Sequence, residues 1–276
     1  LLLFINLKTR KYYLYLPSFL IGIWTKQTAV MFIPILFFYI ILFESNTHYK
    51  LVKSSISRWI ASVIKIMWVP TIFGAAIFLV NQLYLTPSST VSSNFTVTKF
   101  EYISTQLYVI LHYLGNFILP TSLSADPDIE IITPWYDKRI LMGLLLILTL
   151  IYTAFKCAKN EKTRPISFGI AWFFVALLPT SLVPLFQIAN DHRMFFPFIG
   201  MFIAVGFAGF YYYNLIQKHI YKMSFVIIVL LLISSYSFGT YERNKVWSST
   251  ESLWYDVTIK SPNNGRGLMN YGLSLM

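Results

Sequence analysis

The chain has 276 residues, of which 56% are hydrophobic and only 12% are charged, and its mean hydropathy is +0.60. Because a soluble globular domain carries about 25% charged residues, this composition excludes an ordinary soluble fold. The net charge of +11 comes from 22 Lys and Arg residues that lie mostly in short loops between apolar stretches. Such spacing excludes one basic patch for nucleic acid and indicates residues that orient membrane spans.

The apolar stretches predict an all-α, polytopic membrane protein. A helix needs roughly 17 to 25 apolar residues to cross about 30 Å of hydrocarbon. Helices are expected because lipid leaves no backbone polar group unpaired. We expect the end of one span at 1–7 and about seven further spans, which cover residues 12–25, 28–43, 60–85, 138–156, 166–184, 197–215 and 223–240.

Basic residues fall into alternate loops, as the positive-inside rule requires. If the loop at 50–58 is cytoplasmic, alternation places the basic residues at 8–11, 156–164 and 218–222 on the same side. This assignment predicts a multi-pass protein of the plasma membrane if the source is bacterial, or of the endoplasmic reticulum if it is eukaryotic.

The alternation holds only if the apolar stretch 107–119 does not cross. With about 13 residues this stretch is short for a span, so we predict a re-entrant or interfacial helix that Pro120 ends. Residues 86–137 then form one large external loop. It contains a Ser/Thr-rich run at 88–93, the glycosylation sequon Asn94-Phe95-Thr96, and the acidic residues Asp126, Asp128 and Glu130.

The composition predicts two domains, a membrane domain at 1–240 and an external helical segment at 241–276. In the external segment a Ser-Pro-Asn-Asn turn signal separates two helical runs. Leu268, Tyr271 and Leu275 would share one face of the first helix of a helix-turn-helix unit. The first residues include no initiator Met, and Met276 falls in a helical pattern, so we expect further chain at both ends.

Three consecutive residues between two spans, Asp191, His192 and Arg193, are the first candidates for binding. An acid, a titratable base and a cation close to the membrane suit an anionic ligand, and the planar fork of Arg193 suits a lipid phosphate. The alternative is that Asp191 and Arg193 cap and anchor the following helix. Lys26, at an external turn, either extends to the interface or binds an anion.

Asp126 and Asp128 form an acidic pair that could hold a divalent metal, although Asp-Pro-Asp is also ordinary turn chemistry. Asp191 is the other acidic candidate for such a site. His112 lies among apolar residues and is expected to make a local hydrogen bond. The single cysteine, Cys157, excludes a disulfide framework.

Four segments, in this order, resemble the membrane glycosyltransferases of the GT-C class joined to tetratricopeptide repeats, which include O-mannosyltransferases and bacterial relatives. They read WTKQTAVMFIPILFFYIILFE, TQLYVILHYLGNFILPTSLSADPDIE, NDHRMFFPFIG and RNKVWSSTESLWYDVTIKSPNNGRGLMNYGLSLM. Two departures matter. Gln27 stands where that family usually has an acidic residue, and the family's catalytic acidic motif would lie upstream of Leu1, so the catalytic residues are unknown.

The resemblance implies transfer of a sugar, mannose by analogy, from a polyprenyl-phosphate carrier to a protein or glycan hydroxyl on the external face. Arg193, Lys26 and His192 would then bind the lipid phosphate, and the repeats would present the acceptor. A non-enzymatic membrane scaffold that displays repeats to partner proteins is the alternative. A transporter or an envelope-polysaccharide polymerase would need charged residues within the spans, which are nearly absent here.

Overall fold

The computed structural model describes residues 1–44, 56–81, 83, 98–185 and 187–276, and every regular element in these ranges is helical. The sequon at Asn94, the 88–93 run and the basic residues Lys50 and Lys53 lie outside the described residues. The side chain of Arg58 is also outside them.

Six helical segments in the described ranges are long and apolar enough to cross a membrane. The first is Gln27–Glu44, which consists of η1 (Gln27–Met31), α4 (Phe32–Tyr39) and η2 (Ile40–Glu44). The next three are Ile60–Val80 within α6 (Ile56–Val80), α8 (Lys138–Ala158) and α9 (Arg164–Leu182). The last two are Asp191–Leu215, which consists of η4 (Asp191–Met194) and α10 (Phe195–Leu215), and α11 (His219–Val246). The structure therefore supports a multi-pass membrane protein with one span fewer than the sequence predicted.

The missing span is the one predicted at 12–25, where α3 covers only Tyr15–Thr25. Tyr13 has a positive φ of 53°, a left-handed conformation that a helix interior does not accept. Eleven residues rise only about 16 Å, which is roughly half of the hydrocarbon thickness. At 1–7, where the sequence predicts the end of a span, extended Asn6 separates two short helices, α1 (Leu2–Ile5) and α2 (Leu7–Lys11).

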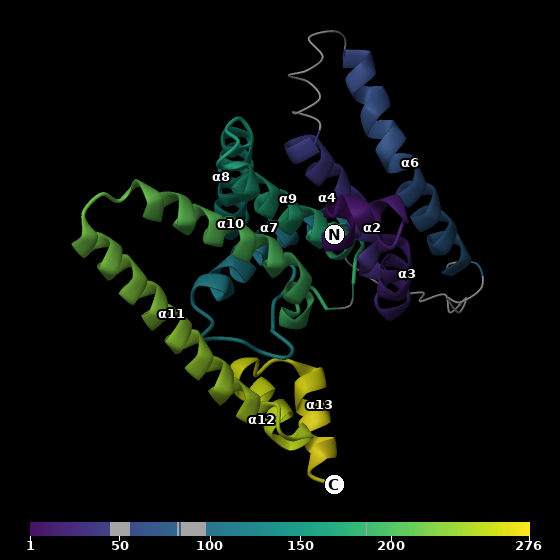
Figure 1. The fold of residues 1–276 in the computed structure, drawn as a ribbon. Coiled ribbons are helices and arrows are strands. Elements are labelled where there is room, and N and C mark those ends of the chain that lie inside the picture. The colour runs from purple at the N-terminus through teal and green to yellow at the C-terminus, as the bar shows by residue number, and fades with distance from the viewer. Residues whose placement is uncertain (45–55, 82, 84–97, 186) are drawn as a thin grey trace.

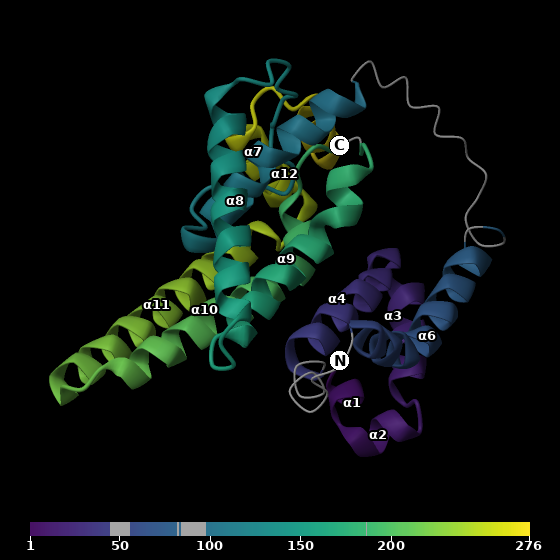
Figure 2. The ribbon, with the colours of Figure 1, turned by 90° about the horizontal axis from the view of Figure 1, so that it is seen from above.

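The helices form an N-terminal group and a central group that meet along α9. Figures 1 and 2 show α1 to α4 and α6 on one side, and α7 (Lys99–Ile118), α8, α9 and α10 on the other. α9 lies at the centre of the molecule, because it packs against α4, α7, α8 and α10. Its residues Phe173 and Leu177 are buried with Val109 and Tyr113 of α7 and Met201 of α10 in the largest apolar cluster.

α9 and α10 pack closely because two glycines face each other. A Cβ atom at Gly169 would collide with the carbonyl oxygen of Gly200, and a Cβ at Gly200 would collide with that of Gly169. Small residues let membrane helices approach until their backbones touch. This close contact fixes the position of η4, which precedes α10 and carries the Asp191–Arg193 candidates.

α7 is longer than the helix that the sequence predicted at 107–119. It begins at Lys99, after a capping box in which the Thr98 side chain and Glu101 exchange hydrogen bonds. Its first turns bury Ser104, Thr105 and Gln106 against the rest of the molecule. α7 is not among the helices that are apolar enough to cross a membrane, which agrees with the predicted non-crossing helix. Whether α7 is re-entrant or interfacial stays a prediction.

α11 diverges from the central group and ends beside two short helices, α12 (Thr250–Lys260) and α13 (Gly265–Ser274) (Figure 1). It runs six residues past Thr240, where the sequence placed the domain boundary, because YERNKV contains no helix breaker. The turn predicted at 261–264 is confirmed. The segment LMNYGLSLM, however, belongs to the second helix of the pair, and Leu268 and Leu275 are exposed rather than packed on α12.

Candidate functional site

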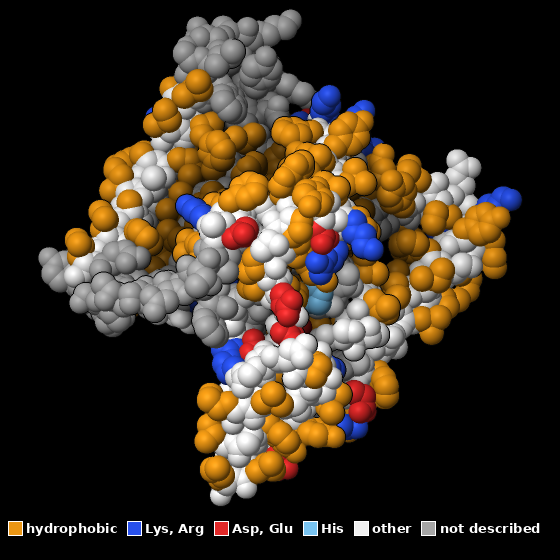
Figure 3. Space-filling view, turned by 180° about the vertical axis from the view of Figure 1, so that it is seen from behind, with side chains coloured by type: hydrophobic (Ala, Val, Ile, Leu, Met, Phe, Trp, Pro, Cys, Tyr) orange, Lys and Arg blue, Asp and Glu red, His pale blue; other side chains and the backbone are white. Residues whose placement is uncertain are grey.

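Charged side chains gather where the central helices meet the C-terminal helices. Figure 3 shows red, blue and pale-blue side chains in the middle of one face, above the C-terminal helices and between apolar surfaces. The segments that meet here are the 119–137 loop, the 183–190 loop with η4, and α12 with α13. Five of the six residues that the sequence selected as binding or acidic candidates lie in these segments. The sixth, Lys26, directly follows the end of α3.

The three consecutive candidates on η4 project in three directions. Asp191 points to the 119–137 loop, where its carboxylate accepts hydrogen bonds from the Ser124 backbone N–H at 3.1 Å and from Asn116 Nδ2 at 3.3 Å. His192 is exposed, and its backbone N–H donates to Asn190 Oδ1 at 3.1 Å. Asp191 therefore anchors η4 to the loop beside it.

Arg193 points back to the 183–190 loop. Its Nη1 donates to the Gln187 carbonyl oxygen at 2.9 Å, and its Nη2 donates to Gln187 Oε1 at 3.4 Å. The guanidinium is thus oriented by Gln187, six residues before it in the chain. An arginine carries five N–H donors, so this contact leaves several for another ligand.

Polar side chains of α7 hold the last turn of α9 and the loop that precedes η4. The Tyr102 hydroxyl donates to the Thr180 carbonyl at 2.8 Å, and Gln106 Nε2 donates to the Ile188 carbonyl at 3.1 Å. The Tyr113 hydroxyl accepts from the Asn190 N–H at 2.8 Å and donates to the Asn190 carbonyl at 3.3 Å. Burial raises the pKa of Tyr113 to about 12, so it keeps the proton that this second bond needs.

His112 makes the local hydrogen bond that the sequence predicted, with its Nε2 atom 3.2 Å from Asn116 Nδ2. Asn116 also donates to Asp191, so His112, Asn116 and Asp191 form one part-buried cluster. Burial lowers the pKa of His112, and the negative charge of Asp191 opposes that shift only partly. The imidazole is therefore neutral at physiological pH.

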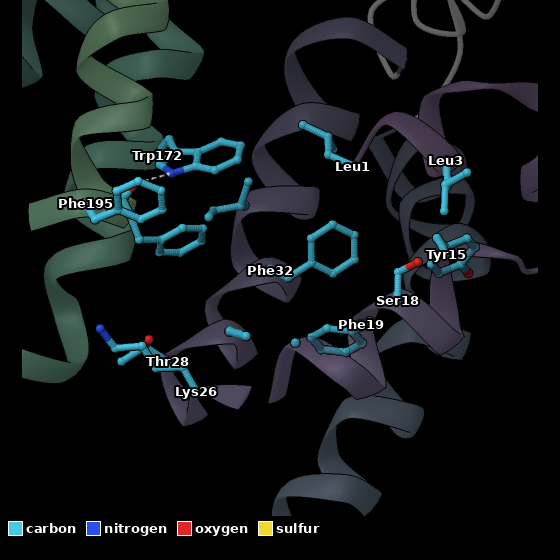
Figure 4. A pocket seen from close by; sticks show the side chains of 14 residues that line it. Leu1, Leu3, Tyr15, Ser18, Phe19, Lys26, Thr28, Phe32, Trp172 and Phe195 are labelled. Atoms are coloured by element: carbon cyan, nitrogen blue, oxygen red, sulfur yellow. Dashed lines mark hydrogen bonds between the residues drawn. The ribbon is translucent and has the colours of Figure 1, made fainter. Parts of the chain in front are cut away.

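A cavity of about 370 Å³ lies between the N-terminal helices and the start of α10. Figure 4 shows Phe19, Phe32 and Tyr15 on one side and Trp172 and Phe195 on the other. Trp172 is fixed by a hydrogen bond from its Nε1 to the Phe196 carbonyl at 3.0 Å. The walls are thus mostly aromatic and aliphatic.

Lys26 lines one end of this cavity, and its charge acts on the neighbouring η4. The side chain of His192 interacts electrostatically with both Lys26 and Arg193. No ion pair within the described ranges involves Lys26. The structure therefore places the three residues proposed to bind phosphate within electrostatic reach of one another, although only Lys26 lines the cavity and His192 and Arg193 do not.

The acidic pair of the 119–137 loop is divided between two roles. Asp126 is buried, and its Oδ2 accepts from Arg266 of α13, with Nη2 at 2.5 Å and Nε at 2.8 Å. Asp128 is exposed, and its backbone N–H donates to Ser261 Oγ at 3.2 Å. Among the described residues, no group of three or more His, Cys, Asp or Glu side chains is arranged to hold a metal ion.

Three residues of the site were missed from the sequence, namely Gln187, Asn116 and Arg266. Each contacts a partner at least 61 positions away, and Gln187 also contacts Arg193, six positions away. No motif marks them. A comparison with protein families, with curated proteins and with solved structures finds no match to this chain.

Proposed function

We propose that this chain is the donor-binding part of a membrane glycosyltransferase. It would hold a polyprenyl-phosphate sugar, with mannose as the sugar by resemblance, while the sugar passes to a protein or glycan hydroxyl on the external face. The observation that carries the proposal is the apolar cavity between α3, α4, α9 and α10, with Lys26 at one end and His192 beside it.

The chemistry of this cavity fits the two parts of a lipid phosphate. Aromatic walls of Phe19, Phe32 and Trp172 suit an isoprenoid chain, and ligand sites of about 300–1,000 Å³ are typically apolar with a few polar groups. The ammonium group of Lys26 suits the phosphate. A bound anion would also offset the positive charges of Lys26 and Arg193, which both act on His192.

The roles divide according to the contacts. Lys26 and His192 are exposed and would contact the phosphate, whereas Arg193 is half-buried and would add positive charge from beneath while it holds Gln187. Stabilisation of a leaving phosphate by such fixed charges is the usual source of rate in transfer from charged leaving groups.

Binding of farnesyl phosphate, a short polyprenyl monophosphate, tests this proposal. The purified protein should bind it, and should bind the neutral alcohol farnesol at least about tenfold more weakly, because only the phosphate can use the cationic end. Lys26→Ala should remove most of that difference. Lys99→Ala, at an exposed lysine in the first turn of α7, is the matched control and should bind like the unmodified protein.

Equal affinity for farnesyl phosphate and farnesol would refute a phosphate site at this cavity. An equal loss in Lys26→Ala and Lys99→Ala would show only a general effect of net charge.

A non-enzymatic scaffold is the second candidate. It is favoured by the exposed apolar side chains of α13, which include Leu268, Met269 and Leu273. Exposed apolar groups on a short external helix suit a protein partner. Full-length protein that binds farnesyl phosphate would count against this candidate, because a scaffold has no need for a lipid phosphate.

A further inference from the structure

Four side chains form a continuous chain of hydrogen bonds from the C-terminal helices to η4. Arg266 of α13 donates to Asp126 Oδ2 at 2.8 Å. Gln187 Nε2 donates to the other carboxylate oxygen, Asp126 Oδ1, at 3.0 Å. Arg193 in turn donates to the carbonyl and side-chain oxygens of the same Gln187.

Each link depends on the one before it. Asp126 is only 5% exposed, so its carboxylate needs both Arg266 and Gln187 to replace lost water. Gln187 uses its Nε2 group on Asp126, and this fixes which way its amide faces. With that orientation its Oε1 accepts from Arg193 and from Asn190 Nδ2 at 3.0 Å.

The same carboxyl-bearing loop also binds the turn between α12 and α13. Asn264 Nδ2 donates to the Asp126 carbonyl at 3.1 Å, and the Asp128 N–H donates to Ser261 Oγ. Undocking of α13 would therefore remove several bonds from Asp126 at once. Asp126 would then no longer hold the Gln187 amide in its present orientation. Arg193 would lose its contact with Gln187 Oε1 and keep only the contact with the Gln187 backbone carbonyl.

We propose that Asp126 and Gln187 are positioning residues that couple docking of the α12–α13 pair to phosphate binding beside η4. This inference rests on the proposed function. In the docked state Arg193 is held next to His192 and the end of the cavity, so the docked state binds the lipid phosphate more tightly. By thermodynamic linkage, the bound phosphate equally favours docking of α13. An acceptor segment that contacts this helix pair would thus be sensed at the donor site.

A double-mutant cycle with farnesyl phosphate tests the coupling. Arg266→Gln should weaken its binding about fivefold, the lower end of typical coupling between sites. Gln187→Met, similar in size but without hydrogen bonds, should weaken it about tenfold, since Arg193 then loses Oε1. The double variant should bind no more weakly than Gln187→Met, because the two residues act in series. Affinity for farnesol should not change in any of them.

Lys260→Gln is the matched control. Lys260 Nζ donates to the Leu123 carbonyl at 2.8 Å, so it also joins the C-terminal helices to the 119–137 loop, but it lies outside the chain of four. Because it loosens docking but leaves the four-residue chain intact, Lys260→Gln should weaken binding clearly less than Arg266→Gln does. Arg266→Lys, which keeps one charged contact to Asp126, should recover part of the loss and shows that Arg266→Gln did not merely unfold the tail.

Two outcomes separate this inference from the proposed function. If the unmodified protein does not bind farnesyl phosphate, the proposed function fails and the inference fails with it. If it binds, but Arg266→Gln has no effect or the two losses add to about fiftyfold, the donor site stands and the coupling is refuted.

Discussion

At the scale of single residues, the site depends on a 3₁₀ turn. With three residues per turn, consecutive side chains diverge by about 120°, so Asp191, His192 and Arg193 reach three different neighbours. The sequence predicted the charged character of the group. It could not predict the partners, because Ser124 is 67 positions from Asp191 and Asp126 is 61 positions from Gln187.

The contacts of Arg193 are compatible with both roles that the sequence suggested for it. Its contacts to Gln187 give it the anchoring role that the sequence considered, and its position beside His192 agrees with the binding role. One side chain can do both, because Gln187 accepts from only some of the N–H donors of the Arg193 guanidinium group.

His112 should make stability depend on pH in the mildly acidic range. Burial lowers its pKa in the folded chain below the ordinary 6.5, so the unfolded chain binds the proton more readily. The free energy of unfolding should therefore fall as the pH drops below about 6.5 and through the lowered value, and should be unaffected above it. His112→Gln can still bond Asn116 but does not titrate. Thermal unfolding of both proteins at pH 8 and pH 5 should show a larger loss for the unmodified protein, whereas equal losses would contradict a buried neutral imidazole.

At the scale of elements, the apolar pattern predicted the type and place of the long helices but not their ends. Six of the seven predicted spans coincide with the six long apolar helices. The start of α7 could have been predicted, because Thr98 and Glu101 have the spacing of a capping box. The start of α3 could not, because nothing in Tyr12-Tyr13-Leu14 indicates a left-handed residue.

The paired glycines give a prediction for α9 and α10. Gly200→Ala would place a methyl group against the Gly169 carbonyl, 2.8 Å from the Phe173 nitrogen, so the helices must separate. Overpacking of this kind costs about 1–3 kcal/mol. Gly206→Ala on the same helix is the matched control, because its Cβ would meet nothing within 4 Å. In detergent, the midpoint temperature of thermal unfolding should be several degrees lower for Gly200→Ala than for Gly206→Ala, as such a cost implies. Equal midpoint temperatures would mean that α9 and α10 do not approach this closely.

At the scale of the whole molecule, three segments far apart in the sequence meet at one end. Ser124 bonds Asp191, Asp126 bonds Arg266, and Asp128 bonds Ser261, so the 119–137 loop, η4 and the C-terminal helices must share a side of the membrane. The connection between α10 and α11 lies at the other end of α11 (Figure 1). This agrees with the alternation of basic loops.

A second contact supports the N-terminal part of that topology. α3 is too short to cross, which removes the sequence argument for placing the basic residues at 8–11 inside. However, Arg10 Nη1 pairs with Glu44 Oε1 at 2.7 Å, and Glu44 ends the Gln27–Glu44 span. The basic residues of α2 therefore lie at the end of the span that leads to the 50–58 loop.

Single-cysteine labelling in intact cells or sealed vesicles tests the topology. In a Cys157→Ser background, Asp128→Cys and Asn160→Cys each place a thiol at an exposed position, one beside the C-terminal helices and one between α8 and α9. A membrane-impermeant maleimide applied from outside should label residue 128 at once, because its loop is predicted to be external. It should label residue 160 only after permeabilisation, because Lys156, Lys159, Lys162 and Arg164 surround it and basic loops stay on the cytoplasmic side. Labelling of both residues after permeabilisation confirms that both thiols are reactive. Protection of residue 128 together with external labelling of residue 160 would reverse the topology and, since Lys26 and His192 would reverse with it, would place the proposed phosphate site on the cytoplasmic face.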